Sequence, residues 1–428
     1  MTNDLTKGVI WKKLILFAIP LLLSSLVQQL YNTVDLIYVG NLLGKNQSSA
    51  VGTSSLLITC LVGFFGGMSV GSGVVVAKAF GCSERTKLRR AVHNAVALSV
   101  FGGILLTIIG WLLAPMYLRA VNTPPEISKE ALSYLRIYFF SFVSIMTYNI
   151  CAGVIRALGD SKSPLIAQFI GGLVNVAMDA VFLKVFEDGV SGVAWATLIS
   201  QTIAALYVVW RLTKLDDEIA LKLRDIGIDK PILCDVLKMG VPAGAQSLLI
   251  TLSNVMAQYQ INSLDIDAIA AFTAYFKVEL ILYLPIVAFG QAIMTFSGQN
   301  IGAGNLKRMC IGTRKCLIIA CCITAVCSVM AIAFGSQLFR IFNKEPEVIA
   351  LGVQIISVTF PFYFVYNFLQ ILGDSIRGAG KTQPPMFIVM VNICIIRTIL
   401  LFILVPGNPN VRSVAVTYPI TWALAGAC

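Results

Sequence analysis

The sequence predicts an all-α integral membrane protein with twelve transmembrane helices in two six-helix lobes, related by a pseudo-two-fold axis along the membrane normal. Three observations lead to this fold class. The composition is 57% hydrophobic and only 12% charged over 428 residues, with a mean hydropathy of +0.83, which is far outside the range of soluble domains. Apolar runs of membrane-spanning length recur twelve times along the chain. The two halves of the chain also match each other at a constant offset.

The apolar runs define the helices that we expect. They cover 14–39, 50–77, 91–113, 133–154, 165–186, 191–212, 239–262, 268–297, 312–335, 351–375, 386–405 and 411–428. The first run is too long for a signal-peptide core and leads into Val39-Gly40-Asn41 instead of a small-residue cleavage site, so we expect it to remain in the mature protein. The last run is barely long enough, and the chain stops without a polar tail, as in a truncated C-terminus.

The basic residues indicate the orientation. With these spans, 22 Lys and Arg residues fall at the N-terminus and in the even-numbered loops, against 8 on the opposite side. The positive-inside rule therefore places both termini in the cytoplasm of a multi-pass protein in the bacterial inner (plasma) membrane. The net charge of +11 is explained by this placement, so we expect no nucleic-acid partner.

The internal repeat sets the domain boundaries. Ile155-Arg156-Ala157-Leu158-Gly159 recurs 221 residues later as Ile376-Arg377-Gly378-Ala379-Gly380, and Pro20 recurs as Pro242. The longest polar stretch separates the two copies. We therefore predict an N-lobe at 1–213, a cytoplasmic linker at 214–237 and a C-lobe at 238–428. Six spans return the chain to its starting side, so the lobes share one orientation and leave a substrate path between them.

Cysteine and histidine give no sign of redox, metal or enzyme chemistry. Most of the eleven cysteines lie inside apolar runs without a Cys-x-x-Cys pattern, and we interpret them as small helix-packing residues. The single histidine, His93, falls in a predicted basic loop. A membrane-embedded enzyme would need a nucleophile–base or metal constellation, so we do not expect catalytic residues.

The first span contains two residues that are costly in a transmembrane helix. Pro20 removes a backbone hydrogen bond and favours a kink. Asp35 places a carboxylate at membrane depth, which costs about 3 kcal/mol or more unless it is used. We interpret this span as a helix that bends at Pro20 and binds through Asp35. The alternative is a plain membrane anchor with a packing kink and an interfacial carboxylate.

A second carboxylate lies at the depth of the first. Asn175 and Asp179 have the i, i+4 spacing that puts both on one face of the fifth span. At about 1.5 Å per residue from the outer helix ends, Asp35 lies roughly 6 Å deep, Asp179 roughly 10 Å and Thr197 of the sixth span roughly 9 Å. The repeat places Ala257, Ile396, Leu400 and Tyr418 at the corresponding positions of the second half. The ionisable cluster therefore belongs to the N-lobe alone.

Other charged residues also fall within the membrane. Glu279 in the eighth span and Arg397 in the eleventh lie near mid-membrane, together with Lys277, and we predict a structural Glu279–Arg397 pair, with a direct substrate contact as the alternative. Asp374 precedes Arg377 by three residues, which predicts a local ion pair at the inner membrane edge.

Taken together, these residues resemble the multidrug and toxic compound extrusion (MATE) transporters over essentially the whole chain. The resemblance is carried by Ile19-Pro20 with Gln28, Tyr31, Asp35 and Gly40, by Arg156-Ala157-Leu158-Gly159-Asp160-Ser161-Lys162-Ser163-Pro164, by Gly189-Val190-Ser191-Gly192-Val193-Ala194-Trp195-Ala196-Thr197 and by Gly298-Gln299-Asn300-Ile301-Gly302-Ala303-Gly304. It implies a secondary antiporter that exports amphipathic, often cationic drugs or metabolites in exchange for inward H⁺ or Na⁺. It also implies a cation-coupling site at Asp35, Asn175, Asp179 and Thr197, with no other metal and no cofactor.

One branch of that family carries acidic residues in helices 7 and 10. This sequence has Thr251 and Tyr366 at about those places, so we expect no cation site in the C-lobe.

Polar, aromatic and thioether residues near the predicted axis between the lobes are candidates for the substrate cavity, because aromatic faces attract cations and methionine adapts to many shapes. The candidates are Gln28, Tyr31, Phe64, Met68, Tyr148, Asn149, Met178, Met256 and Tyr259. We expect small organic substrates, the lipid bilayer as surroundings and a monomer. A lipid-linked glycan or lipid flippase of related two-lobe architecture is the alternative function, although such proteins tend to need a more cationic central cavity.

Overall fold

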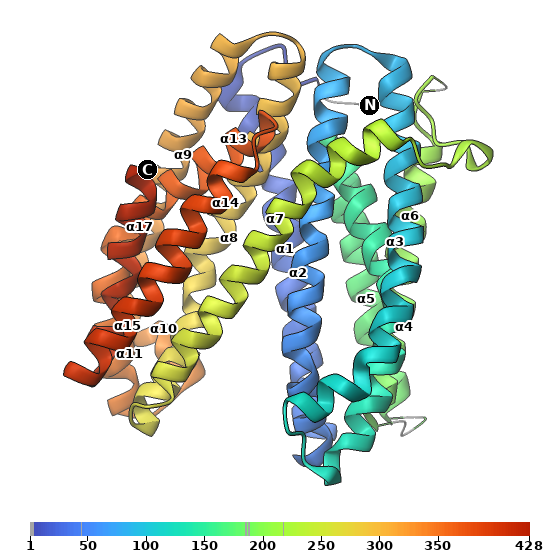
Figure 1. Ribbon diagram of the computed structural model, residues 1–428. Helices are drawn as coiled ribbons and strands as arrows, with labels where there is room; N and C mark the ends of the chain where they lie inside the picture. The colour runs from blue at the N-terminus through green and yellow to red at the C-terminus, as the bar shows by residue number, and fades with distance from the viewer. Residues whose placement is uncertain (1–3, 44, 185, 187–188, 217) are drawn as a thin grey trace. The chain divides into compact units, whose positions relative to one another are not determined.

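The computed structural model describes residues 4–43, 45–184, 186, 189–216 and 218–428, and all regular structure in them is helical (Figure 1). Eleven helical stretches among these residues are long and apolar enough to cross a membrane. The last predicted span is built from two shorter helices, α16 and α17, which adjoin at Val416. The helical elements are α1 (Ile10–Leu42), α2 (Lys45–Gly81), α3 (Arg85–Ala120), α4 (Pro125–Ala157), α5 (Lys162–Lys184), α6 (Gly189–Thr213), η1 (Leu223–Asp225), α7 (Lys230–Ile261), α8 (Ile266–Gly302), α9 (Leu306–Ala333), α10 (Gly335–Phe342), α11 (Pro346–Thr359), η2 (Phe360–Phe362), α12 (Tyr363–Asn367), η3 (Phe368–Leu372), α13 (Gly373–Gly378), α14 (Gln383–Val389), η4 (Met390–Ile396), α15 (Arg397–Gly407), α16 (Val411–Ala415) and α17 (Thr417–Ala427).

The helices form two compact units. Unit 1 contains Ile19–Gly244 with Asp4 and Gly302–Gly304, and unit 2 contains Leu5–Ala18, Ala245–Ile301 and Asn305–Cys428. Helices α1 and α7 are each divided between the two units. Helix α1 changes unit between Ala18 and Ile19, just before Pro20, and α7 changes unit at Gly244, just after Pro242. Both helices continue through their prolines.

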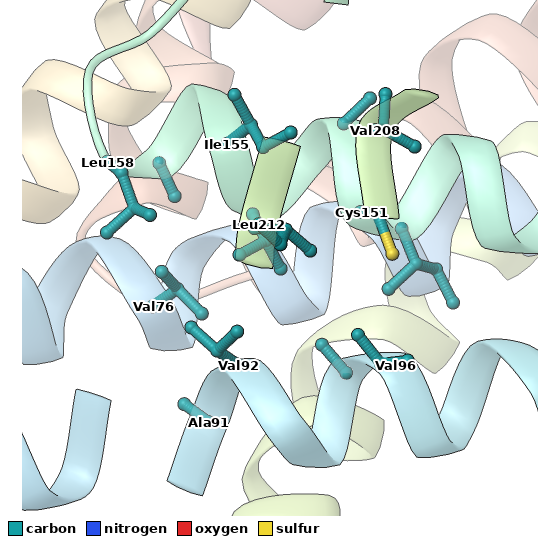
Figure 2. Close-up of a cluster of buried hydrophobic side chains, with 14 of the residues drawn as sticks. Val76, Ala91, Val92, Val96, Cys151, Ile155, Leu158, Val208 and Leu212 are labelled. Atoms are coloured by element: carbon teal, nitrogen blue, oxygen red, sulfur yellow. The ribbon is translucent and has the colours of Figure 1, made fainter. Parts of the chain in front are cut away.

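Unit 1 is organised around α4, which packs against α2, α3 and α6. Figure 2 shows part of this core, where Val76 of α2, Val92 of α3, Ile155 of α4 and Val208 of α6 meet with Cys151. All five are at most 1% exposed. Lipid is as apolar as these side chains, so close packing stabilises the contact between helices. Cys151 serves here as a small packing residue.

The segment after α6 packs on the beginning of α3. Arg89 forms an ion pair with Asp225, and His93 is buried and accepts a hydrogen bond from the Lys222 backbone nitrogen at 3.1 Å. The placement of His93 in a basic loop is therefore wrong, because α3 begins at Arg85 and takes that stretch into the helix. The segment predicted as a linker lies within unit 1, and its last residues are already part of α7.

The repeated turn has the same backbone in both copies. Gly159 and Gly380 have φ values of +88° and +87°, a left-handed conformation that favours glycine. After Gly159, the Asp160 carboxylate accepts hydrogen bonds at 3.0 Å from the Lys162 and Ser163 nitrogens at the start of α5. It also pairs with Arg211 of α6 at 3.4 Å. The polar motif after α4 is therefore a helix cap that fixes α5 against α6.

The end of α8 holds the N-terminal segment of unit 2. The Leu5 nitrogen donates to Gln299 Oε1 at 2.9 Å, and Arg308 donates to the Gly8 carbonyl at 2.8 Å. Gln299 and Leu5 are fully buried. The stretch from Gly298 to Gly304 therefore has a structural role, because its Gln299 anchors the segment that leads into α1.

Two helical stretches of unit 2 are interrupted by wider turns. The π-helical segments η3 and η4 separate α12 from α13 and α14 from α15, respectively. Such segments leave backbone groups without their usual partners and occur often at functional sites. No feature of the sequence predicted them.

Candidate functional site

The carboxyls of Asp35 and Asp179 meet inside unit 1. Asp35 comes from α1 and Asp179 from α5, and each carboxyl acts electrostatically on the other. Asp179 is fully buried, and in the described structure neither of its oxygens nor Asp35 Oδ1 accepts a hydrogen bond. A buried and a half-buried carboxylate that lie close together repel strongly, so the pair requires a proton or a cation to offset the charge.

Asn175 adds one more buried oxygen to the three carboxyl oxygens that lack a donor. It lies one turn before Asp179, is 3% exposed, and its Oδ1 is also buried without a donor among the described residues. The predicted shared face of α5 is therefore the buried one. Carboxylate and amide oxygens suit protons and hard cations. No group of three or more His, Cys, Asp or Glu side chains gathers within the described part of the chain, so this set differs from that of a transition-metal site.

Small residues bring α5 close to its neighbours. A Cβ on Gly172 would lie 3.1 Å from the Tyr31 ring of α1, and a Cβ on Gly171 would lie 3.2 Å from Ala204 of α6. Both contacts are tighter than most side-chain contacts, so larger residues would push the helices apart. The Tyr31 hydroxyl also accepts a hydrogen bond from Gln168 at 3.3 Å. These contacts hold α1 and α5 together about two to three turns before Asp179.

Two tyrosines of α4 complete the surroundings of the pair. Tyr134 and Tyr138 are one turn apart, with ring centroids separated by 5.8 Å. Both phenols lie within electrostatic reach of Asp35, and Tyr134 also within reach of Asp179. Neither tyrosine was predicted from the sequence, although two tyrosines at i, i+4 spacing in a transmembrane helix are a signal that could have indicated them.

Thr197 lies half-buried on α6, the helix that packs against α5. Its hydroxyl donates to the Val193 carbonyl of the same helix, at 3.0 Å, so its oxygen can still accept or act as a ligand. The structure brings Asp35 close to Asp179, with Asn175 one turn before Asp179 on α5.

The candidates for the substrate cavity occupy several environments. Tyr148 is buried within electrostatic reach of Tyr31, and Gln28 is exposed beside Tyr31. Phe64 and Met68 of α2 pack against α7, where the carbonyl of Phe64 and the sulfur of Met68 approach Gly244 and Gly240. The other candidates are the half-buried Asn149 and Met178 and the exposed Met256 and Tyr259.

Among the ion pairs of the described residues none joins Glu279 directly to Arg397, although each is within electrostatic reach of the other. Tyr363 donates to Glu279 at 2.8 Å, and Arg397 donates to Ser253 at 2.7 Å. Both charged groups instead line a cavity of about 450 Å³ in unit 2. Each of the two side chains also has hydrogen-bond partners of its own. The local Asp374–Arg377 ion pair is confirmed.

Comparison with known proteins shows relatives along the whole chain. Residues 20–181 and 242–403 each match the MatE family model. The two matches begin at Pro20 and Pro242, so they confirm the internal repeat. The chain is 29% identical over 398 residues to the probable multidrug resistance protein YpnP of Bacillus subtilis, covering 92% of this chain and 88% of YpnP. It is 25% identical over 401 residues to the probable multidrug resistance protein NorM of Thermotoga maritima, covering 92% and 85%.

Solved structures give the same result for the fold. The outward-facing structure of a multidrug resistance MATE family transporter of the MOP superfamily superimposes with a TM-score of 0.93 at 21% identity, covering 100% of this chain and 95% of the other. A MATE structure in the bent conformation gives a TM-score of 0.92, covering 100% and 96%. The predicted twelve-helix, two-lobe membrane fold is therefore confirmed.

Proposed function

The chain belongs to the MatE family, and on that premise we propose that it is a secondary antiporter, exporting amphipathic, often cationic organic compounds in exchange for inward H⁺ or Na⁺. The relatives are multidrug transporters and not enzymes. They do not favour the flippase alternative. The proposal concerns the coupling ion and the substrate class, which we derive from the residues of this chain.

The observation that carries the proposal is the set of buried oxygens without donors at Asp35, Asn175 and Asp179. When a proton or Na⁺ enters, it removes the repulsion between the two carboxyls. The amide oxygen of Asn175 and the hydroxyl oxygen of Thr197 then serve as further ligands around the ion. Because Asp35 and Asp179 come from different helices, binding of the ion draws α1 and α5 together.

Pro20 is the position at which α1 bends, in this proposal, when the ion binds. It lies fifteen residues before Asp35, about 22 Å along the helix, where α1 passes from unit 2 into unit 1. A proline inside a helix lacks one backbone hydrogen bond, so bending there costs less than elsewhere. In this proposal, bending of α1 at Pro20 narrows the predicted substrate cavity and expels the drug. Ion entry and drug release are then one event.

We place the protein in the bacterial inner membrane as a monomer with both termini in the cytoplasm. The asymmetry of basic residues supports the orientation. The beginning of α3 and the segment after α6 are rich in such residues, and in unit 1 Arg85, Arg89 and Arg90 pair with acidic residues of that segment.

Transport in proteoliposomes tests the proposal. Purified protein should move a fluorescent lipophilic cation against its gradient only when an opposing H⁺ or Na⁺ gradient is imposed, and collapsing each gradient separately identifies the ion. Asp35→Asn should bind the cation but lose gradient-driven export, whereas Glu347→Gln, an exposed carboxylate at the start of α11, should behave as wild type. Wild-type export by both Asp35→Asn and Asp179→Asn would place the coupling site elsewhere.

A further inference from the structure

The cavity of unit 2 lies among helices that the proposed coupling site does not use. It is formed by α7, α8 and the stretch from α12 to α17, and its volume of about 450 Å³ is within the range of small-molecule sites. Both π-helical segments contribute to its wall, through Leu369 and Gln370 of η3 and Ile393 of η4. Segment η4 ends directly before Arg397 and so helps to place that side chain.

The protein forms hydrogen bonds with one carboxylate oxygen of Glu279, the acidic residue of this cavity. Glu279 Oε1 accepts hydrogen bonds from Tyr363 at 2.8 Å and from Tyr275 at 3.3 Å. Among the described residues, Oε2 accepts none, and it is not enclosed by protein atoms. One oxygen therefore fixes the carboxylate in place while the other is open to the cavity.

The basic group is arranged in the same way. Arg397 is 4% exposed, its Nη2 donates to Ser253 at 2.7 Å and to Asn254 at 3.0 Å, and its Nε donates to Ser253 at 3.2 Å. In the described structure Nη1 has no protein partner and is not enclosed. Arg397 also lies over the Tyr418 ring, 5.3 Å from its centroid. The guanidinium is thus held on one side and free on the other.

The rest of the wall is aromatic and electrically balanced. Trp422 packs edge-on to Tyr363, with centroids 4.8 Å apart, and is 5.5 Å from Tyr366, which in turn is 6.3 Å from Tyr283. At one end of the cavity Arg377 is paired with Asp374. Two opposite charges of the wall, Glu279 and Arg397, therefore remain without a direct ion-pair partner among the described residues and lie beside aromatic side chains.

From this arrangement we propose that the cavity of unit 2 is a binding site for a zwitterionic aromatic molecule, with its ammonium group on Glu279 and its carboxylate on Arg397. A ligand with one charge would neutralise only one of the two groups and leave the other buried and uncompensated, which is costly. A zwitterion satisfies both, and its aromatic body packs against Trp422 and Tyr366. This inference adds a ligand class to the proposed transport function, but equilibrium binding does not depend on ion coupling.

The probe is Nα-dansyl-lysine, a fluorescent zwitterion whose ammonium and carboxylate are joined by a flexible chain. Its methyl ester carries only the positive charge, and its Nε-acetyl derivative only the negative one. Binding to the purified protein is followed by fluorescence. We expect the zwitterion to bind about tenfold or more tighter than either derivative, because each derivative loses one charge-assisted hydrogen bond. Equal affinity of all three probes would overturn the proposal.

Substitutions assign each charge to its residue. Glu279→Gln keeps an acceptor for the two tyrosines and should weaken the zwitterion and the ester about tenfold or more, while leaving the acetyl derivative unchanged. Arg397→Gln should weaken the zwitterion and the acetyl derivative about tenfold or more, while leaving the ester unchanged. Lys277→Gln is the matched control, because Lys277 lies two residues from Glu279 on α8 but is exposed and does not line the cavity. Loss of the same probes in Lys277→Gln, or of all probes alike in Glu279→Gln, would contradict the assignment.

The same probes separate this inference from the proposed function. In the Asp35→Asn and Asp179→Asn variants, gradient-driven export should be lost while Nα-dansyl-lysine binds with wild-type affinity. Absence of zwitterion binding in a protein that still exports a lipophilic cation would refute the unit 2 site alone. Binding without ion-driven transport in the wild type would refute the antiport proposal alone.

Discussion

Replacing Asp179 by Asn tests the central element of the coupling site. The wild-type protein places two carboxyls close enough to act on each other, and no donor among the described residues reaches either oxygen of Asp179. Two unit charges about 4 Å apart at an effective dielectric constant of about 20 repel by about 4 kcal/mol. Relief of that repulsion is equivalent to about a thousandfold in cation affinity. The Asn variant has no such repulsion, and its amide can donate to Asp35.

The magnitude can be read from thermal unfolding of the purified protein. A ligand at a hundred times its dissociation constant stabilises the folded state by about 2.7 kcal/mol. The wild-type unfolding temperature should therefore rise as the coupling ion is added, by Na⁺ at alkaline pH or by acidification. Asp179→Asn should unfold at a higher temperature than wild type in the absence of the ion, and should show little further rise.

The control is Glu347→Gln, which removes the same formal charge from an exposed position in the first turn of α11. It should keep the full response to the ion, as wild type does. If Asp179→Asn responded to the ion as strongly as Glu347→Gln, the two carboxyls would not be the ion site, and the mechanism derived from them would be refuted.

Three further results are expected. In a cysteine-less background, a cysteine at position 222 should not react with an impermeant reagent in intact cells while one at 129 should, and labelling at 222 would contradict the topology. Pro20→Ala should lower the export rate about tenfold, equivalent to about 1.4 kcal/mol for the bend, with drug affinity in a binding assay unchanged; an unchanged rate would show that α1 does not bend there. Ala257→Asp should not restore ion-driven export to Asp35→Asn, because the counterparts Ile396 and Leu400 supply no ligand oxygen, and restored export would contradict the assignment to one lobe.

The fold could be predicted from the sequence because lipid imposes strong constraints. Membrane-length apolar runs fix the helices, and the repeat of Pro20 at Pro242 and of Gly159 at Gly380 fixes the two-lobe plan. The shared buried face of Asn175 and Asp179 could also be anticipated, since their i, i+4 spacing specifies it without knowledge of tertiary contacts.

What the sequence did not reveal depends on contacts between distant residues. Glu279 and Arg397 have opposite charges at similar depth, yet Tyr363 and Ser253, which no local pattern connects with them, take up half of each group. His93 was misplaced for a related reason, since its partner Lys222 lies 129 residues further along the chain. Periodicity shows which residues share a helix face. It does not show which groups of another helix will form hydrogen bonds with the polar residues on that face.

The net charge of the exported substrate determines whether the membrane potential contributes to export. When a monovalent cation leaves in exchange for one inward H⁺ or Na⁺, no net charge crosses the membrane, and only the ion concentration gradient drives export. When a zwitterion leaves, one positive charge enters, and the membrane potential contributes about 2.3 kcal/mol per 100 mV, equivalent to about a 50-fold gradient. Export of a zwitterion should therefore accelerate when proteoliposomes are given an inside-negative potential with protein inserted so that export is outward. A cationic substrate should show no such dependence. Equal responses of the two substrates would contradict one-for-one exchange.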